Sequence, residues 1–524
     1  MTNRIFYLVA FLSFFCNTLF AQLAQPAIIS MQAFYGNNFE SFIRPIRTFD
    51  GGFILSVATN SSTGNLLNAC SSNNPRVVFN KYNADGSVLE WQRCRDSDPD
   101  SAFGYVFPLP DATYVMGGGS FTSTAIDFMI KKEDANGANL WSKVYGGSGG
   151  ELLRDMAATN DGGYIMVGIS SSNDGDVGFH YGGQFNHDIW ALKLDSNGKK
   201  VWSAVIGGTG DEEAHCVVPM PNGGCYILGY TQSSDYDCVS NHGLNDVLVV
   251  RLDSAGTKVW THCFGGSASD GIQNGWAVDN GKGGILFATS TRSNNGDVSG
   301  LIGAFDYWLV NINNAGNIIW NKCYGSTGNE TANSVCIADD NSIWLCGSSY
   351  IQGGQVDANY GSFDAWIIHT DSVGNFLSAK VLGAIDFDEA TVMYPLAGGG
   401  VLVGGYYYAP GPVGGEFPST WFGNTDLFLA KLAPWTTDIV DPILSEIQMD
   451  IYPSPATTTI TVKPRDSRTD YSISMINISG SRVYSKINLV GQTTIDVSAF
   501  ASGAYYLQTT SKNGIKFSQA VLIN

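Results

Sequence analysis

The stretch Asp188–Asp211, which reads DIWALKLDSNGKKVWSAVIGGTGD, decides the fold because its pattern returns along most of the chain. Ile189–Leu194 has the residue types of a strand, and Asp195-Ser-Asn-Gly198 supplies a tight turn. Lys199–Ile206 then has the pattern of the returning strand. The stretch therefore predicts a β-hairpin.

The aspartate that opens this hairpin marks a repeat. Equivalent aspartates open similar stretches roughly 58 to 62 residues apart, a period typical of propellers and repeat arrays. They are Asp127, Asp188, Asp246, Asp306, Asp364 and Asp426. The returning strands carry Trp91, Trp141, Trp202, Trp260 and Trp320, and Ser378 takes this place in the sixth unit. We expect the tryptophan rings to pack between neighbouring sheets.

Each unit continues through a Gly-rich corner, an acidic residue, a third strand, a Gly-Gly turn and a fourth strand. Glycine suits such turns because it adopts positive φ at little steric cost. Four short antiparallel strands in a unit predict one propeller blade, and the repeats predict about seven. Ile28–Gly36 aligns with Val201–Gly207. We therefore expect the N-terminal strand to complete the last blade and close the ring.

The predicted fold class is all-β: a seven-bladed β-propeller over residues 22–432, closed by the N-terminal strand and followed by a small Ig-like β-sandwich. Residues 1–21 have the pattern of a signal peptide. Residues 433–448 contain two prolines and are interpreted as a linker. Short alternating stretches over residues 449–524 predict the sandwich. No segment of the mature chain reads as a transmembrane helix.

The charge of the chain excludes one class of partner. The net charge is −19, and the 28 basic residues are scattered rather than clustered. Nucleic acid is therefore not an expected partner. A charged fraction of only 14%, together with abundant Gly, Tyr and Trp, is typical of an extracellular all-β protein.

The cysteines indicate an oxidising compartment. Cys70 lies in the loop before an aspartate-type strand and Cys94 at the end of a tryptophan strand, and Cys238 and Cys263 have the same relation in a later unit. Antiparallel pairing would bring each couple together, so we predict the disulfides Cys70–Cys94 and Cys238–Cys263. The pairing of Cys216, Cys225, Cys323, Cys336 and Cys346 stays open, and several cysteines have burial as small hydrophobic residues as their alternative.

The C-terminal module carries specific motifs. They are Tyr452-Pro-Ser-Pro-Ala456, Ile476-Asn-Ile-Ser-Gly480 with Val483, Ile495-Asp-Val-Ser498, Gly503-Ala-Tyr-Tyr-Leu507 and Ala520–Asn524. Residues 449–524 thereby resemble the type A C-terminal sorting domain of type IX secretion in Bacteroidota. The motif positions are Tyr452, Pro453, Pro455, Gly480, Gly503 and Tyr505, and Ser454 departs from the Asn common between the prolines.

The resemblance implies a route and a partner. It implies export by the signal peptide, passage across the outer membrane by the type IX machinery, and removal of the sorting domain during release or surface attachment. The cargo is similar to Gly- and Trp-rich propeller repeats of exported proteins, through Asp161-Gly-Gly-Tyr164 and Ser172-Asn-Asp-Gly-Asp-Val177. No single activity belongs to that repeat type.

Two sets of acidic residues are candidate site residues. Asp174, Asp176 and Asp297 lie in long loops whose oxygen-rich sequences could hold calcium, although Asn, Asp and Gly are also ordinary turn formers. An acid also follows each Gly corner, at Glu151, Asp211, Glu212, Asp270, Glu330 and Asp388. If the next strand is innermost, these acids would ring one mouth of the channel; the alternative is that they bond neighbouring backbone.

Aromatic and histidine side chains are the third candidate set. The long loops carry His180, Tyr181, His187, Tyr236, His242, Tyr360 and Trp421. Aromatic faces beside carboxylates suit recognition of a glycan or a protein, and loop packing is the alternative.

The function expected is therefore that of an exported or surface binding module. One alternative is a secreted carbohydrate-active enzyme, a glycoside hydrolase or lyase, with its site at the propeller mouth. The other is a structural surface protein. No nucleophile elbow, phosphate loop or zinc motif is present in the sequence, and no catalytic residue can be nominated.

Overall fold

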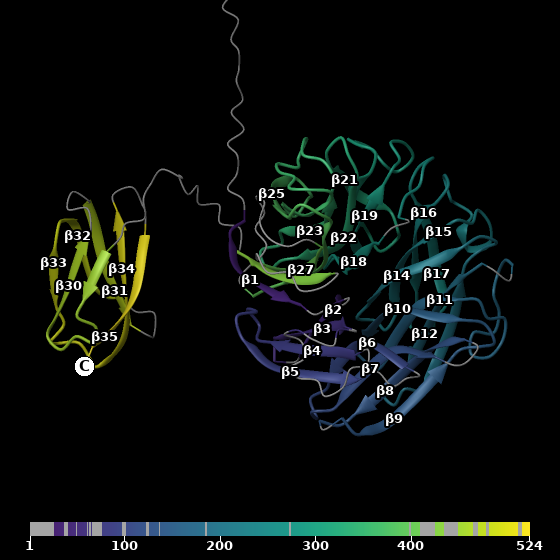
Figure 1. Ribbon diagram of the computed structural model, residues 1–524, viewed down its shortest axis with the longest axis horizontal. Coiled ribbons are helices and arrows are strands. Elements are labelled where there is room, and N and C mark those ends of the chain that lie inside the picture. The colour runs from purple at the N-terminus through teal and green to yellow at the C-terminus, as the bar shows by residue number, and fades with distance from the viewer. Residues whose placement is uncertain are drawn as a thin grey trace, which may run out of the picture. The chain divides into compact units, whose positions relative to one another are not determined.

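The chain divides into two compact units, Met1–Thr436 and Thr437–Asn524. The computed structural model is shown in Figure 1. It describes residues 26–35, 40–48, 50–59, 61, 64, 76–96, 101–121, 125–135, 137–183, 186–271, 274–397, 400–408, 425–433, 449–464, 470–477, 482–511 and 516–523. The predicted signal peptide, residues 1–21, and most of the predicted linker lie outside these residues.

The described residues of the first unit form antiparallel sheets of four strands each. In chain order these are β2(Glu40–Arg47), β3(Phe53–Thr59), β4(Arg76–Tyr82) and β5(Leu89–Asp96); β6(Ser101–Pro108), β7(Tyr114–Phe121), β8(Ile126–Glu133) and β9(Asn139–Tyr145); β10(Glu151–Ala158), β11(Tyr164–Ser170), β12(Asp188–Leu194) and β13(Lys200–Ile206); β14(Glu212–Pro219), β15(Cys225–Thr231), β16(Asp246–Leu252) and β17(Lys258–Phe264); β18(Trp276–Asp279), β19(Ile285–Thr291), β20(Asp306–Ile312) and β21(Ile318–Tyr324); β22(Glu330–Ile337), β23(Ile343–Ser349), β24(Asp364–Thr370) and β25(Phe376–Leu382); and β26(Asp388–Pro395), β27(Val401–Tyr407) and β28(Asp426–Leu432) with β1(Ile28–Phe34). One 3-10 helix, η2(Tyr236–Cys238), precedes β16.

The strands β2, β6, β10, β14, β18, β22 and β26 lie toward the middle of this unit. The strands at the opposite edge of each sheet, such as β5, β9 and β1, lie toward the outside (Figure 1). Strands β2, β6, β10, β14, β18, β22 and β26 contact one another in that order, and β26 contacts β2. β1 pairs antiparallel with β28, and Phe34 lies opposite Leu427. The unit is therefore all-β and propeller-like.

The predicted hairpin is confirmed at β12 and β13. β12 is buried along its whole length, and Trp190 lies opposite Val205 of β13. The turn closes because the Gly198 N–H donates to the Asp195 carbonyl at 3.0 Å. Gly198 has φ +72, which favours glycine at this position.

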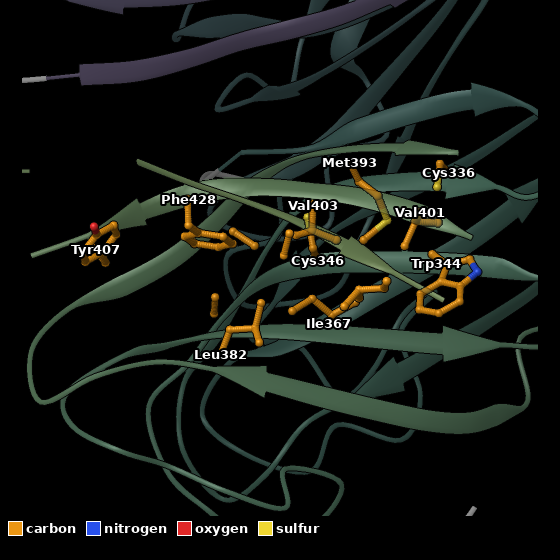
Figure 2. Close-up of a cluster of buried hydrophobic side chains, with 14 of the residues drawn as sticks. Cys336, Trp344, Cys346, Ile367, Leu382, Met393, Val401, Val403, Tyr407 and Phe428 are labelled. Atoms are coloured by element: carbon orange, nitrogen blue, oxygen red, sulfur yellow. The ribbon is translucent and has the colours of Figure 1, made fainter. Parts of the chain in front are cut away.

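The core lies between neighbouring sheets. Figure 2 shows one such cluster, between the β22–β25 sheet and the sheet of β26, β27 and β28. Its labelled members are Cys336, Trp344, Cys346, Ile367, Leu382, Met393, Val401, Val403, Tyr407 and Phe428. Burial of these apolar side chains is the main force that holds adjacent sheets together.

The repeated tryptophans also join neighbouring sheets, as predicted. The Trp202 indole N–H donates to the Ser254 carbonyl at 3.2 Å, and Trp260 donates to Asn314 in the same way at 3.1 Å. Ser254 and Asn314 lie in hairpin turns of the next sheet. Each ring therefore closes the outer edge of a junction between sheets.

The second unit has two sheets around one core. The first contains β29(Met449–Tyr452), β30(Thr459–Pro464) and β33(Thr493–Asp496), and the second contains β31(Asp470–Asn477), β32(Arg482–Val490), β34(Gly503–Ser511) and β35(Lys516–Ile523). Ile460 and Val462 of the first sheet share a buried cluster with Met475 and Leu507 of the second. Two antiparallel sheets over a shared core form a sandwich. Within the described residues of the whole chain, no helix is long and apolar enough to span a membrane.

Candidate functional site

The acids that follow the Gly corners do not line an opening. Glu151, Glu212, Asp270, Glu330 and Asp388 are fully buried, so the prediction that they ring the channel mouth is wrong for these five. They hold the corners instead: the Gly208 N–H donates to Glu212 at 2.8 Å, and the Thr231 hydroxyl donates to the same carboxylate at 2.5 Å. Only Asp211 of the predicted set is partly exposed, and it accepts the His187 N–H at 2.9 Å.

Each buried acid lies beside the aspartate that opens a β-strand of the preceding sheet. A Cβ atom placed on Gly207 would lie 2.0 Å from Asp188 Oδ1 and 2.9 Å from Glu212 Oε2, so only glycine fits between them. Burial raises the pKa of Asp188 to about 8, and the Glu212 carboxylate adds to this shift. Burial likewise raises the pKa of Asp388 to about 8 and of Glu40 to about 7. These carboxyl pairs are part of the scaffold.

The end at which the inner strands begin is lined by other residues. A cavity of about 430 Å³ lies where β14, β22 and β26 begin. We call it the mouth cavity, and its lining residues are Glu213, His215, Asn274, Thr331, Ser348, Phe363, Phe387 and Glu389. Glu213 and Glu389 each follow a buried corner acid by one residue. Because successive side chains of a strand point to opposite faces, they reach the cavity and the corner acids do not.

β-Bulges lie in two of the inner strands, and one of them places His215 in the cavity lining while the other places Asn333 behind Glu389. The pairing of the inner strands shifts between Ala214 and Cys216 in β14 and between Ala332 and Ser334 in β22. The extra residues are His215 and Asn333. A bulge re-aims a side chain, and bulges are frequent next to binding sites.

Glu389 is held by several hydrogen-bond donors. The Asn333 amide donates to Glu389 Oε1 at 2.7 Å and to the Ala390 carbonyl at 2.9 Å. The Tyr406 hydroxyl donates to Glu389 Oε2, and the Asn274 amide donates to Asn333 at 2.9 Å. Burial and the Glu389 carboxylate raise the pKa of Tyr406, which keeps its hydroxyl protonated. The result is a fixed carboxylate in a polar network.

The opposite wall carries an ion pair and a neutral imidazole. The Arg154 guanidinium lies 2.6 Å from Glu213 and compensates its charge. Burial, with a smaller contribution from Arg154, lowers the pKa of His215 to about 4. His215 is therefore uncharged at neutral pH and can both donate and accept a hydrogen bond.

Aromatic side chains form the rim beside Glu389. The ring centroids of Phe363 and Phe387 lie 5.1 Å apart, and Tyr350 lies 4.9 Å from Phe363. Phe387 stacks on Tyr406 at 6.0 Å and meets Tyr408 edge-on at 5.9 Å. Phe363 and Phe387 also line the cavity, so apolar rings lie next to the polar network of Glu389.

The loop residues predicted to bind a ligand do not line the mouth cavity in the described part of the chain. His180 contacts the Asn186 carbonyl at 2.8 Å, and His242 contacts Asp246 at 2.7 Å. The Tyr360 N–H donates to Asp364 at 2.6 Å. Tyr181 and Tyr236 pack together, with centroids 4.8 Å apart, and Trp421 lies outside the described residues. His180, His242 and Tyr360 therefore make contacts within the loops that carry them or with the first residue of the strand that follows.

The residues predicted to bind calcium serve as hydrogen-bond acceptors or ion-pair partners. Asp174 accepts the Ser148 N–H at 2.7 Å, and Asp297 accepts the Gly265 N–H at 3.3 Å. Asp176 forms an ion pair with Lys200 at 2.5 Å. In the described ranges, no three His, Cys, Asp or Glu side chains gather as metal ligands. These contacts correspond to the turn-forming alternative.

Among the described cysteines, one is in a disulfide and two others lie close together as thiols. Cys94 is disulfide-bonded, whereas Cys70 lies outside the described residues. Cys238 and Cys263 are free thiols, so the predicted disulfide between them is absent from this structure, although the two thiols hydrogen-bond to each other. Of the remaining described cysteines, Cys225, Cys323, Cys336 and Cys346 are thiols outside any disulfide, and the Cys216 sulfur accepts the Ala277 N–H at 3.2 Å.

The predicted sorting residues lie at the ends of strands in the second unit. Tyr452 ends β29, and its side chain is 47% exposed. Ser454, which departs from the common Asn, accepts the Leu522 N–H of β35 at 3.1 Å. The Tyr505 hydroxyl donates to the Ala501 carbonyl at 2.8 Å. Gly480 lies outside the described residues.

Comparison with protein families identifies this second unit. Residues 450–524 match the family of the secretion system C-terminal sorting domain. This type IX sorting domain indicates a secreted protein or one at the outer cell surface, and it implies interaction with the secretion machinery. No curated protein matches the chain.

Solved structures give distant matches. The extracellular domain of a proposed hybrid two-component system of B. thetaiotaomicron matches with 11% identity and a TM-score of 0.40, over 95% of this chain and 60% of that chain. PorZ of Porphyromonas gingivalis, titled an essential surface component of its type IX secretion system, matches with 12% identity and a TM-score of 0.31, over 92% and 70%. Puromycin hydrolase matches with 10% identity and a TM-score of 0.42, over 82% and 60%. The chain spans about 60% of the first of these structures, and likeness at this level carries no functional argument.

Proposed function

We propose that the protein is an exported binding module that holds a neutral glycan in the mouth cavity. The sorting domain supplies the export, and the mouth cavity supplies the site. The observation that carries the proposal is the combination, in one cavity, of Glu389, which Asn333 holds in place, and the Asn274 amide with the rings of Phe363 and Phe387. Aromatic faces pack against the apolar faces of sugar rings, and carboxylate and amide groups bind sugar hydroxyls.

The charge of the site favours a neutral ligand over an acidic one. Within the described residues, the hydrogen-bond partners of Glu389 include no basic side chain, and Arg154 is already paired with Glu213. The chain as a whole carries a net charge of −19. An anionic polysaccharide would meet unfavourable charge both at the site and at long range.

We further propose that the sheets of the first unit are the blades of a closed seven-bladed propeller, with β1 completing the last blade. The pairing of β1 with β28 and the ring of contacts among the inner strands support this proposal. Closure would keep the inner strands at fixed separations. A preformed site lowers the ordering cost of binding.

The test is a screen of the full chain against neutral and acidic polysaccharides, with both retention and products measured. We expect retention on a neutral glycan and an unchanged product mass, and calcium chelation should leave binding intact. New reducing ends or unsaturated products would overturn the binding role in favour of a glycoside hydrolase or lyase. Failure to bind any glycan by a protein that is abundant on cells would favour a structural surface role.

A further inference from the structure

Cys238 and Cys263 lie on two elements that pack together. Cys238 ends η2 in the loop before β16, and Cys263 lies on β17, the fourth strand of the same sheet. Both side chains are buried, with exposed fractions of 0% and 4%, and both belong to one hydrophobic cluster. The thiols hydrogen-bond to each other, which raises the pKa of Cys238 and lowers that of Cys263.

The same strand position carries a cysteine in two other sheets, which gives an internal comparison. Cys263 lies opposite Leu248, the third residue of β16; Cys94 lies opposite Val78 of β4, and Cys323 lies opposite Trp308 of β20. Cys94 is disulfide-bonded. The loop before β20, residues 292–305, contains no cysteine, so Cys323 has no counterpart of Cys238 there.

We propose that Cys238 and Cys263 form a disulfide in the exported protein. The sorting domain indicates an extracellular destination, and exported chains pass through a compartment that oxidises thiols. The Cys263 thiolate attacks the disulfide of a thiol–disulfide oxidoreductase of that compartment and forms a mixed disulfide, releasing one thiolate of the oxidoreductase. The Cys238 thiolate then displaces the second, so the Cys238–Cys263 bond forms, two protons leave, and the two electrons reduce the oxidoreductase.

The burial of both sulfur atoms sets the order of events. Once the loop packs on β17, no oxidoreductase can reach either thiol. Oxidation therefore precedes final packing of the loop. The bond joins to β17 the segment that carries Tyr236, which is 62% exposed and has a φ of +48. Tyr236 packs against Tyr181, so the disulfide would also hold this exposed aromatic pair.

A type IX host expresses the full chain, and the protein that it secretes is unfolded in iodoacetamide without reductant. We expect a cross-linked peptide pair containing Cys238 and Cys263, lighter by two hydrogen atoms than the reduced pair, while Cys323 carries the alkyl label. Cys323→Ser should leave the cross-link in place, and Cys238→Ser should leave Cys263 labelled. Cys94 reports whether the compartment has oxidised the chain.

Two results overturn the proposal. If Cys238 and Cys263 both carry the label in the secreted protein while Cys94 is protected, the pair stays reduced in an oxidising compartment. Labelling of all three cysteines overturns it as well, because the exported chain is then not oxidised at all.

Discussion

At the residue scale, Glu389 links the scaffold to the mouth cavity. Its side chain is only 8% exposed, and it receives donors from β22 through Asn333 and from β27 through Tyr406. A carboxylate buried to this extent is stable only when such donors compensate its desolvation. The geometry of the site is therefore set by two strands besides its own.

Removal of one donor tests this role. Tyr406→Phe should lower the free energy of unfolding by about 1–3 kcal/mol, because Glu389 loses a charge-assisted hydrogen bond and remains buried. Tyr408→Phe is the matched control: its ring packs 5.7 Å from Tyr406, but the residue is 38% exposed. Chemical denaturation of both variants gives the comparison. Equal effects would mean that the Tyr406 hydroxyl does not support Glu389.

The prediction of the mouth residues from the sequence is wrong by one position along the strand. The sequence predicts Glu212 and Asp388 because an acid recurs after each Gly corner. The acid recurs because the junctions between sheets contain a buried acid at this position. The residue after it, Glu213 in β14 and Glu389 in β26, lines the cavity. Glu213 and Glu389 have no acidic equivalent in the other units, so the repeat pattern cannot reveal them. The alternation of side chains between the two faces of an inner strand could have predicted that they face the cavity.

At the element scale, the junctions between sheets contain buried carboxyl pairs. Asp188 and Glu212 flank Gly207, and Asp188 Oδ1 has no hydrogen-bond partner within the described residues. At neutral pH, a pKa of about 8 leaves Asp188 protonated in the folded chain, whereas in the unfolded chain it is ionised. The folded state thus binds a proton that the unfolded state releases.

This difference predicts loss of stability toward alkaline pH. Between the ordinary aspartate pKa of 3.8, which applies to the unfolded chain, and the folded pKa of about 8, the folded state binds more protons than the unfolded state, so the free energy of unfolding falls as pH rises. The slope should reach about 1.4 kcal/mol per pH unit for each such group. Asp188→Asn should reduce this slope, measured by denaturation between pH 5 and pH 9 at ~0.5-unit steps.

A matched variant separates this effect from general charge effects. Asp195→Asn removes a carboxylate from an exposed turn, where it accepts the Lys199 N–H at 2.8 Å. It should leave the slope unchanged. An Asp188→Asn protein with the slope of the wild type would mean that this carboxyl group is ionised in the fold.

The elements themselves were largely predictable. Hairpins such as β12–β13 follow from strand residues around a turn whose Gly198 needs positive φ, and the recurrence of about 60 residues places them in series. The bulges at His215 and Asn333 were not predictable, because a bulge adds one residue to a strand without changing its composition. They nevertheless shape the site, because His215 lines the cavity and Asn333 holds Glu389.

At the scale of the whole molecule, the propeller-like scaffold and the sorting domain are separate units. The first unit brings residues from β14, β22, β23 and β26 to one cavity, although they lie far apart in sequence. The second unit matches a sorting domain and carries its own core. Export belongs to the second unit, and the binding role that we propose rests on the mouth cavity of the first unit alone.

The most direct measurement of that role is a calorimetric titration of the full chain with the neutral glycan that the screen selects, using Phe387→Ala and Tyr236→Ala. Phe387 lines the mouth cavity, whereas Tyr236 is an exposed aromatic outside it. We expect Phe387→Ala to weaken binding by about tenfold or more and Tyr236→Ala to leave it unchanged. Unchanged binding by Phe387→Ala, or a loss confined to Tyr236→Ala, would contradict a ligand site at the mouth.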